Sequence, residues 1–281
     1  MTRIDRRALF TSGAAAALLA AAGGSVNASP KTGGVLRVAV PREGGMLEQA
    51  ARGAVYDRLT EISSDGLLRG ELAVSWTSAP DARTWTFDLR EDAVFHEGTQ
   101  LTAEHVVASL TVLGVEGADL RTATALGSHQ LLLELVEPNP HLPYLLADAG
   151  QLVSLDGALP VSLSDAVGTG CYRVASAQEG RHFRASRVAG HYKAGTAGWV
   201  DTVEITVIPD ASVRAEALRD GYVDVAALPE PCGLLQRGKF LYHPSSRDMA
   251  LAARHDVGIP RTVGQRVPLD DGRIAERWWR G

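Results

Sequence analysis

The sequence predicts an α/β fold in which a mixed sheet is flanked by helices. The stretch Thr84–Leu110 begins with the alternation of a strand and continues into the apolar spacing of a helix. The stretch Val203–Ala226 has the order strand, helix, strand, which is the connection that two parallel strands require. These two observations define the fold class, and the other elements are consistent with it.

The first stretch is a strand, a turn and a capped helix. Trp85, Phe87 and Leu89 alternate with polar residues, so their side chains share one face of a strand. Gly98 interrupts the apolar pattern and predicts a tight turn. Thr102 is then a good N-cap for the helix that follows. We therefore expect the apolar face of this unit to pack on a core.

The second stretch begins with apolar residues at alternate positions of 203–207, which predicts a strand with one buried face. Asp210 is placed to cap a helix over Ala211–Asp220, and Gly221 follows as the residue just past the helix end. Tyr222–Ala226 is the next predicted strand.

The remaining predicted elements are shorter. Strands are expected at Val35–Val40, Gln130–Val136, Tyr172–Val174, His182–Arg187 and Lys239–Tyr242, and helices around Leu47–Leu59, His141–Leu146 and the tail around Ile274 and Trp278.

Length and composition indicate a globular chain. It has 281 residues, of which 45% are hydrophobic, so it can bury a sizeable core as one large domain or two small ones. The formal net charge is −5 and basic residues are not clustered, which argues against a nucleic-acid partner.

Residues 1–28 have the layout of an export signal. Arg3, Arg6 and Arg7 precede the apolar run Ala14–Ala22, and Val26-Asn27-Ala28 is a small-residue cleavage site. The adjacent arginines are similar to the twin-arginine type, and an ordinary secretory signal is the alternative. The apolar run is too short to span a bilayer, so we expect a soluble protein exported to the periplasm.

Two cysteines are present, Cys171 and Cys232. The sequence leaves two alternatives, a disulfide between them or two buried free thiols. The distance between their Cα atoms would decide between these, and the sequence does not give it.

Three motifs of the first stretch carry a resemblance to a known family. They are Trp-Thr-Phe-x-Leu-Arg from Trp85, Phe-His-x-Gly-Thr from Phe95 and Leu-Thr-Ala-Glu-x-Val-x-x-Ser-Leu from Leu101. Their order resembles the signature of the family 5 extracellular solute-binding proteins, which serve ABC importers of oligopeptides, dipeptides and nickel. The run 207–224 is a second matching block. Gly168-Thr169-Gly170-Cys171-Tyr172 is similar to the family's Gly-Thr-Gly-Pro-Tyr, with Cys171 in place of proline.

The resemblance implies one lobe of a periplasmic-binding-protein-like fold of type II, with the second lobe truncated. In this interpretation residues 1–28 are the signal, 29–267 form lobe I, and 268–281 begin lobe II. The implied function is the periplasmic substrate-binding component of an ABC importer for peptides or similar small solutes. The implied partners are such a solute, the permease subunits in the membrane and a second chain that completes the cleft; no cofactor is implied.

The resemblance places the ligand cleft at the loop after the first strand and at the helix behind it. The candidate ligand-binding residues are Glu43, Gly44, Gly45, Met46 and Tyr56. For Tyr56 the alternative is a tyrosine at the edge of the core with a hydrogen-bonded hydroxyl.

No motif points to an enzyme or a metal site. His96-Glu97 lacks the second histidine of a zinc-protease helix, because position 100 is Gln100, and no Gly-x-Ser-x-Gly elbow occurs. We interpret His96 as a turn residue.

The alternative function is a truncated remnant that acts as a protein-interaction module without solute uptake. In that case Trp278 and Trp279 are candidates for the partner contact, and a locally packed or solvent-exposed tail is the competing interpretation.

Overall fold

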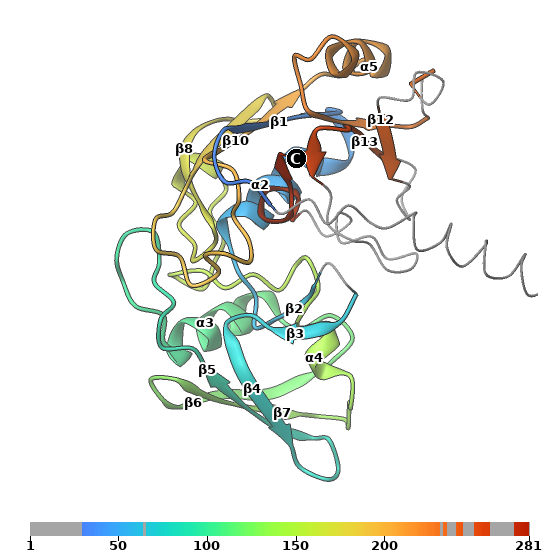
Figure 1. The fold of residues 1–281 in the computed structure, drawn as a ribbon. Helices are drawn as coiled ribbons and strands as arrows, with labels where there is room; N and C mark the ends of the chain where they lie inside the picture. The colour runs from blue at the N-terminus through green and yellow to red at the C-terminus, as the bar shows by residue number, and fades with distance from the viewer. Residues whose placement is uncertain are drawn as a thin grey trace, which may run out of the picture.

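The computed structural model describes residues 30–63, 66–230, 233–234, 240–243, 250–258 and 273–280. The predicted export signal and Cys232 lie outside these ranges. Two main sheets organise the described part of the chain (Figure 1). In the ranges described, no helix is both long enough and apolar enough to cross a membrane.

The larger sheet has seven strands in the order β12-β13-β11-β1-β10-β9-β8. β1 lies in its interior and pairs in parallel with β10 on one side and with β11 on the other. The remaining pairings are antiparallel, so the predicted mixed sheet is confirmed. Its strands are β1 (Val35–Val40), β8 (Tyr172–Gln178), β9 (His182–Arg187), β10 (Thr202–Val207), β11 (Val225–Leu228), β12 (Phe240–His243) and β13 (Ala250–Arg254).

Helices cover both faces of this sheet. On one face, α2 (Met46–Val55) packs over Leu36, Val38 and Val40 in the first core cluster. On the other face, α5 (Ala211–Arg219) connects β10 to β11 and packs in a separate cluster with Ala39. The Asp210 side chain accepts hydrogen bonds from two amides of the first turn of α5, so the predicted cap is confirmed.

The smaller sheet has the order β4-β5-β7-β6 and its own core with α3 (Ala103–Leu113). The alternation in β5 is confirmed, because Trp85, Phe87 and Leu89 are buried. Thr102 caps α3 as predicted, and His105 completes the capping box by accepting from the Thr102 amide. The strands are β4 (Ala73–Ser78), β5 (Thr84–Leu89), β6 (Leu120–Gly127) and β7 (Gln130–Leu135).

The short elements lie between and around the two sheets. They are η1 (Glu43–Gly45), β2 (Thr60–Ile62), β3 (Leu68–Gly70), α4 (Leu142–Leu145), η2 (Leu163–Asp165), β14 (Val257–Gly258), α6 (Ile274–Arg277) and β15 (Trp279–Arg280).

Several predicted boundaries were wrong. The strand expected at Tyr172–Val174 continues to Gln178 as β8. α2 ends at Val55 instead of Leu59, because Tyr56 is extended and the Gly170 amide donates to the Val55 carbonyl. The strand expected at Tyr222 begins at Val225, since the Tyr222 and Val223 amides still bond to the end of α5.

The tail residues 273–280 pack on the same face of the larger sheet as α2 (Figure 1). Ile274, Ala275 and Trp278 belong to the first core cluster, and Trp278 is fully buried. Trp278 is therefore not available for contact with a partner, and the locally packed interpretation is correct for it. Whether these residues begin a second lobe stays a prediction.

Candidate functional site

The loop after β1 lies at the carboxyl edge of the larger sheet. Glu43, Gly44 and Gly45 form the short helix η1 and are exposed, and Met46 begins α2. Gly44 and Gly45 have φ values of +81° and +63°, which side-chain-bearing residues rarely adopt. The ends of β10 and β11 lie at this same edge because both strands run parallel to β1. In open α/β sheets, this edge is where ligands bind.

The structure does not bring Tyr56 to this loop. Tyr56 follows the last residue of α2, and a ten-residue helix is about 15 Å long. The Tyr56 ring lies in the first core cluster with 1% exposure, and burial raises the pKa of its hydroxyl to about 12. Four of the five predicted ligand residues are therefore together, and the fifth is in the core. Ligand contact by any of the five stays a prediction.

Arg214 holds the carboxyl ends of β10 and β11 together. Its Nε donates to the Ala227 carbonyl at 2.7 Å, and its Nη1 donates to the Ile208 and Pro209 carbonyls at 2.5 and 2.8 Å. The Arg214 side chain is buried on α5. The sequence analysis missed this residue, because its partners lie just after β10 and within β11, which are separate segments of the chain.

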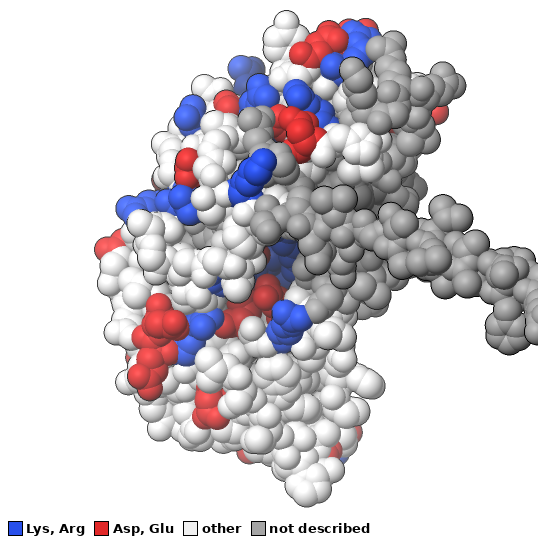
Figure 2. All heavy atoms as spheres, in the orientation of Figure 1, with Lys and Arg blue, Asp and Glu red and all other residues white. Residues whose placement is uncertain are grey.

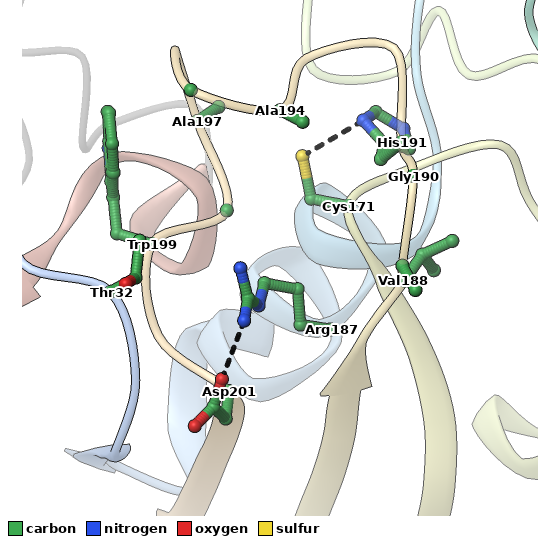
Figure 3. Close-up of a pocket in the computed structure, with 13 residues that line it drawn as sticks. Thr32, Cys171, Arg187, Val188, Gly190, His191, Ala194, Ala197, Trp199 and Asp201 are labelled. Atoms are coloured by element: carbon green, nitrogen blue, oxygen red, sulfur yellow. Dashed lines mark hydrogen bonds and ion pairs between the residues drawn. The ribbon is translucent and has the colours of Figure 1, made fainter.

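A pocket of about 390 Å³ lies at the opposite, amino edge of the same sheet (Figure 3). Thr32 precedes β1 and Asp201 precedes β10, and the loop from Arg187 to Trp199 closes the pocket. Arg187 pairs with Asp201 at 2.8 Å. The six-residue strands put this pocket about 20 Å from the η1 loop, so the two are separate candidate sites.

Cys171 and His191 meet in this pocket (Figure 3). His191 Nε2 is 2.7 Å from the Thr169 carbonyl, which makes Nε2 the protonated nitrogen. His191 Nδ1 therefore accepts from the Lys193 amide at 3.1 Å and from the Cys171 thiol at 3.5 Å. Burial lowers the pKa of His191 and raises that of Cys171, so both groups are neutral at pH 7. Cys171 is a free thiol here, and Cys232 lies outside the described residues.

A buried network of charges lies where the two sheets and the tail meet. Lys193 Nζ bonds to Glu71 and lies 3.2 Å from carboxylate oxygens of both Glu61 and Glu276. Arg273 forms two hydrogen bonds to Glu71, with 2.6 Å between Nη2 and Oε2, and lies 2.9 Å from Glu276. Burial raises the pKa of Glu71, but Arg273 and Lys193 outweigh it and hold that pKa well below its usual range.

Asp57 is the least compensated member of this network. Its Oδ2 accepts from the Thr169 hydroxyl at 2.9 Å, whereas Lys193 and Arg273 are 3.8 and 3.9 Å from its Oδ1. Burial first, and the charge of Glu71 second, raise the pKa of Asp57 to about 7.

Oxygens of Asp57, Glu71 and Glu276 lie within 4.8 Å of one another, which is a spacing that metal ligands also show. Lys193 and Arg273 occupy these oxygens, so we interpret the network as ion pairs. The sequence analysis missed it, because its members come from distant parts of the chain; Glu71 and Arg273, for example, are 202 residues apart.

His96 has a structural role. Its Nε2 donates to the Gly170 carbonyl at 2.8 Å, and its amide donates to the Gly168 carbonyl. This agrees with the interpretation of His96 as a turn residue.

Acidic and basic side chains are interspersed on the described surface that Figure 2 shows, without a continuous basic region on that face. This agrees with the charge pattern of the sequence.

The two-sheet α/β architecture is that of one lobe of a periplasmic binding protein. The Helicobacter pylori periplasmic binding protein DppA, solved with the peptide STSA, matches with a TM-score of 0.64 and 21% identity over 79% of this chain and 52% of its own. NikA from Brucella suis, solved with Fe(III)-EDTA, matches with a TM-score of 0.63 and 24% identity over 76% of this chain and 48% of its own. At these identities the likeness shows the fold.

A family model described as bacterial extracellular solute-binding proteins, family 5 Middle, matches residues 68–243, which is more than half of the chain. The chain belongs to this family. Among curated relatives from Escherichia coli K12, a probable D,D-dipeptide-binding periplasmic protein is 28% identical over 62% of this chain and 38% of its own length. A dipeptide-binding protein from the same strain is 25% identical over 79% of this chain and 47% of its own. The chain spans about half the length of the curated relatives that it matches.

Proposed function

We propose that this chain is the periplasmic substrate-binding component of an ABC importer, and that it binds a peptide or a similar small solute without transforming it. The observation that carries the proposal is the family match over residues 68–243 together with the fold of a binding-protein lobe. The proposed partners are permease subunits in the membrane and a second lobe or chain that closes over the solute.

We place the solute at the η1 loop. Glu43, Gly44 and Gly45 are exposed, and α2 has no side-chain hydrogen bond that caps its first turn. Its first amides are therefore free of a capping side chain and can donate to a ligand carbonyl or carboxylate. Arg214 supports this edge by donating to the Ile208 carbonyl just after β10 and to the Ala227 carbonyl within β11.

A thermal-shift screen followed by calorimetry tests the proposal, with the chain lacking residues 1–28 and a panel of di- to pentapeptides and nickel. We expect at least one peptide to raise the melting temperature with saturable heat. Failure of every compound to bind would contradict the transport function and favour the interaction-module alternative.

Two variants then locate the site. Glu43→Arg changes the charge of the exposed η1 loop, and Trp199→Ala opens the pocket at the opposite edge. We expect Glu43→Arg to weaken peptide binding at least tenfold and Trp199→Ala to leave it unchanged. The reverse result would move the solute to the pocket of Cys171 and His191 and retain the function.

A further inference from the structure

Cys171 and His191 present a thiol and an imidazole lone pair to the same space in the pocket at the amino edge of the larger sheet (Figure 3). Cys171 directly precedes β8, and His191 lies in the loop that follows β9. Their ligand atoms, Sγ and Nδ1, are 3.5 Å apart. Thiolate sulfur and imidazole nitrogen are both common ligands of Zn²⁺, so the geometry of this pair can be compared with that of a zinc site.

The separation of the two ligand atoms fits a tetrahedral ion. Bonds of about 2.3 Å to sulfur and about 2.0 to 2.1 Å to nitrogen, at a tetrahedral angle, place the two atoms about 3.5 Å apart. The same bonds in a linear arrangement would place them about 4.3 Å apart. The observed separation of 3.5 Å therefore matches tetrahedral Zn²⁺. A thiol hydrogen bond can span the same distance, and the orientation of the imidazole and the space beside the sulfur favour the ion.

The backbone orients His191 as a metal ligand. Its Nε2 donates to the Thr169 carbonyl at 2.7 Å, which leaves the lone pair on Nδ1, beside Cys171. A ligating histidine usually donates its second ring nitrogen to a carbonyl or carboxylate in this way. The Asp57 carboxylate, 3.9 Å from Nε2, adds negative charge behind the ring. The Nδ1 lone pair also accepts from the Lys193 amide at 3.1 Å, so the thiol at 3.5 Å is the weaker of two competing donors.

The pocket has room for an ion and its water ligands beside the sulfur. Its volume is about 390 Å³, and a water molecule needs about 30 Å³. Position 198 of the loop is glycine, and a Cβ atom there would lie 3.3 Å from the sulfur. A side chain at this position would therefore occupy the space that the ion needs. Arg187, which also lines the pocket, is paired with Asp201 at 2.8 Å, so its positive charge is balanced.

We propose that Cys171 and His191 bind a Zn²⁺ ion in this pocket, with Sγ and Nδ1 as the two protein ligands. Binding replaces the thiol proton: Zn²⁺ and the Cys171 thiol give a zinc thiolate and one proton, which passes to solvent. Among the described residues, no third histidine, cysteine or carboxylate forms a group with these two, so water takes the remaining positions. The pocket is about 20 Å from the η1 loop, so this proposal and the proposed solute site fail or succeed independently.

The test titrates Co²⁺ and then Zn²⁺ into the full-length chain, reduced and without a histidine tag. Co²⁺ takes the same ligands as Zn²⁺, and a bond from Co²⁺ to a thiolate gives a charge-transfer band in the near ultraviolet. We expect a 1:1 complex with this band, which Zn²⁺ abolishes by displacing Co²⁺, and the release of one proton per ion at pH 7. No charge-transfer band at millimolar Co²⁺ would overturn the proposal.

Two cysteine variants identify the sulfur. Cys171→Ser should lose the charge-transfer band although Cys232 is still present, and Cys232→Ser should keep it. A band that survives in Cys171→Ser, or that is lost in a folded Cys232→Ser chain, would overturn the proposal.

Two histidine variants identify the nitrogen. His191→Gln should weaken Zn²⁺ binding at least tenfold. His182→Gln is the matched control, because His182 also lies beside a carboxylate, at 2.9 Å from Glu204 on the neighbouring strand, but far from a described thiol along the sheet. It should bind Zn²⁺ as the wild type does. An equal loss in both histidine variants would place the ion elsewhere and overturn the proposal.

If Cys171→Ser or His191→Gln does not fold, X-ray absorption at the zinc edge of the zinc-loaded Cys232→Ser chain decides, because Cys171 is then its only cysteine. One sulfur at about 2.3 Å and an imidazole nitrogen at about 2.0 Å from zinc would support the proposal. A zinc ion surrounded by nitrogen and oxygen alone would overturn it.

Discussion

Arg273 and Glu71 are 202 residues apart in the sequence and form a bidentate ion pair inside the protein. Both side chains are fully buried. Arg273 belongs to the tail, and Glu71 lies between β3 and β4, at the start of the smaller sheet. The pair therefore joins the tail to the junction of the two sheets, and Lys193 links it to the loop that follows β9.

Removal of either partner should destabilise the protein strongly, because it leaves a buried charge without compensation. We expect Glu71→Ala and Arg273→Ala each to lower the free energy of unfolding by about 3 to 5 kcal/mol, measured by urea denaturation. Glu137→Ala removes an exposed partner of Arg83 and should cost less than about 1 kcal/mol. Equal losses in the buried and exposed variants would show that the network does not carry this stability.

Asp57 should make stability depend on pH. Its pKa is about 7 in the folded protein and near 3.8 in the unfolded chain, so the folded state binds more protons between these values. The unfolding free energy therefore falls as pH rises from about 4 to 7. Above pH 7 this contribution no longer changes, because Asp57 is then ionised in both the folded and the unfolded state.

The variant Asp57→Asn isolates this effect, because its neutral amide can still accept from the Thr169 hydroxyl. We expect the stability of Asp57→Asn relative to wild type to rise by about 1 to 4 kcal/mol between pH 4 and pH 7 and then to level off. Urea denaturation at several pH values measures this difference. A difference that is constant with pH would mean that Asp57 ionises normally.

Features determined by neighbouring residues could be predicted from the sequence. The Thr102 and Asp210 caps and the apolar face of β5 depend on residues a few positions apart, and the structure confirms all three. The strand-helix-strand order predicted that β10 and β11 are parallel, and both run parallel to β1, which lies between them.

Features that depend on contacts between distant segments could not be predicted. The sequence contains no periodic signal for Arg273 with Glu71 or for Arg214 with the carbonyls at the ends of β10 and β11. α2 ends early because the distant Gly170 amide bonds to Val55. For the same reason, the candidate site separated into an exposed loop and the buried Tyr56.

His96 should make the protein sensitive to acid. Burial lowers its pKa to about 4, so the unfolded chain takes up a proton near pH 6.5 that the folded protein does not bind. Stability from this group is therefore present above pH 6.5 and lost as pH falls to 4.

In His96→Gln, an amide can replace the bond from Nε2 to the Gly170 carbonyl. We expect the loss of unfolding free energy between pH 6.5 and pH 4 to be smaller than in wild type by about 1 to 3 kcal/mol. Some acid sensitivity should remain, because burial also lowers the pKa of His191. An unchanged pH profile would show that His96 already binds a proton in the folded protein.

Gly168 should be intolerant of a side chain because its loop lies directly against the end of α2. A Cβ atom at Gly168 would overlap the carbonyl oxygen of Val55, and one at Gly170 would lie 2.7 Å from that of Ala54. These atoms belong to the backbone and cannot rotate away. We expect Gly168→Ala to cost at least about 2 kcal/mol of unfolding free energy.

Gly127→Ala is the matched control, because no atom lies within 4 Å of a Cβ there and its φ is not positive. We expect its stability to stay within about 0.5 kcal/mol of wild type. Thermal and urea unfolding of both variants make the comparison. If Gly168→Ala were as stable as Gly127→Ala, the close approach of this loop to α2 would not be required, and the glycines of the Gly-Thr-Gly motif would need another explanation.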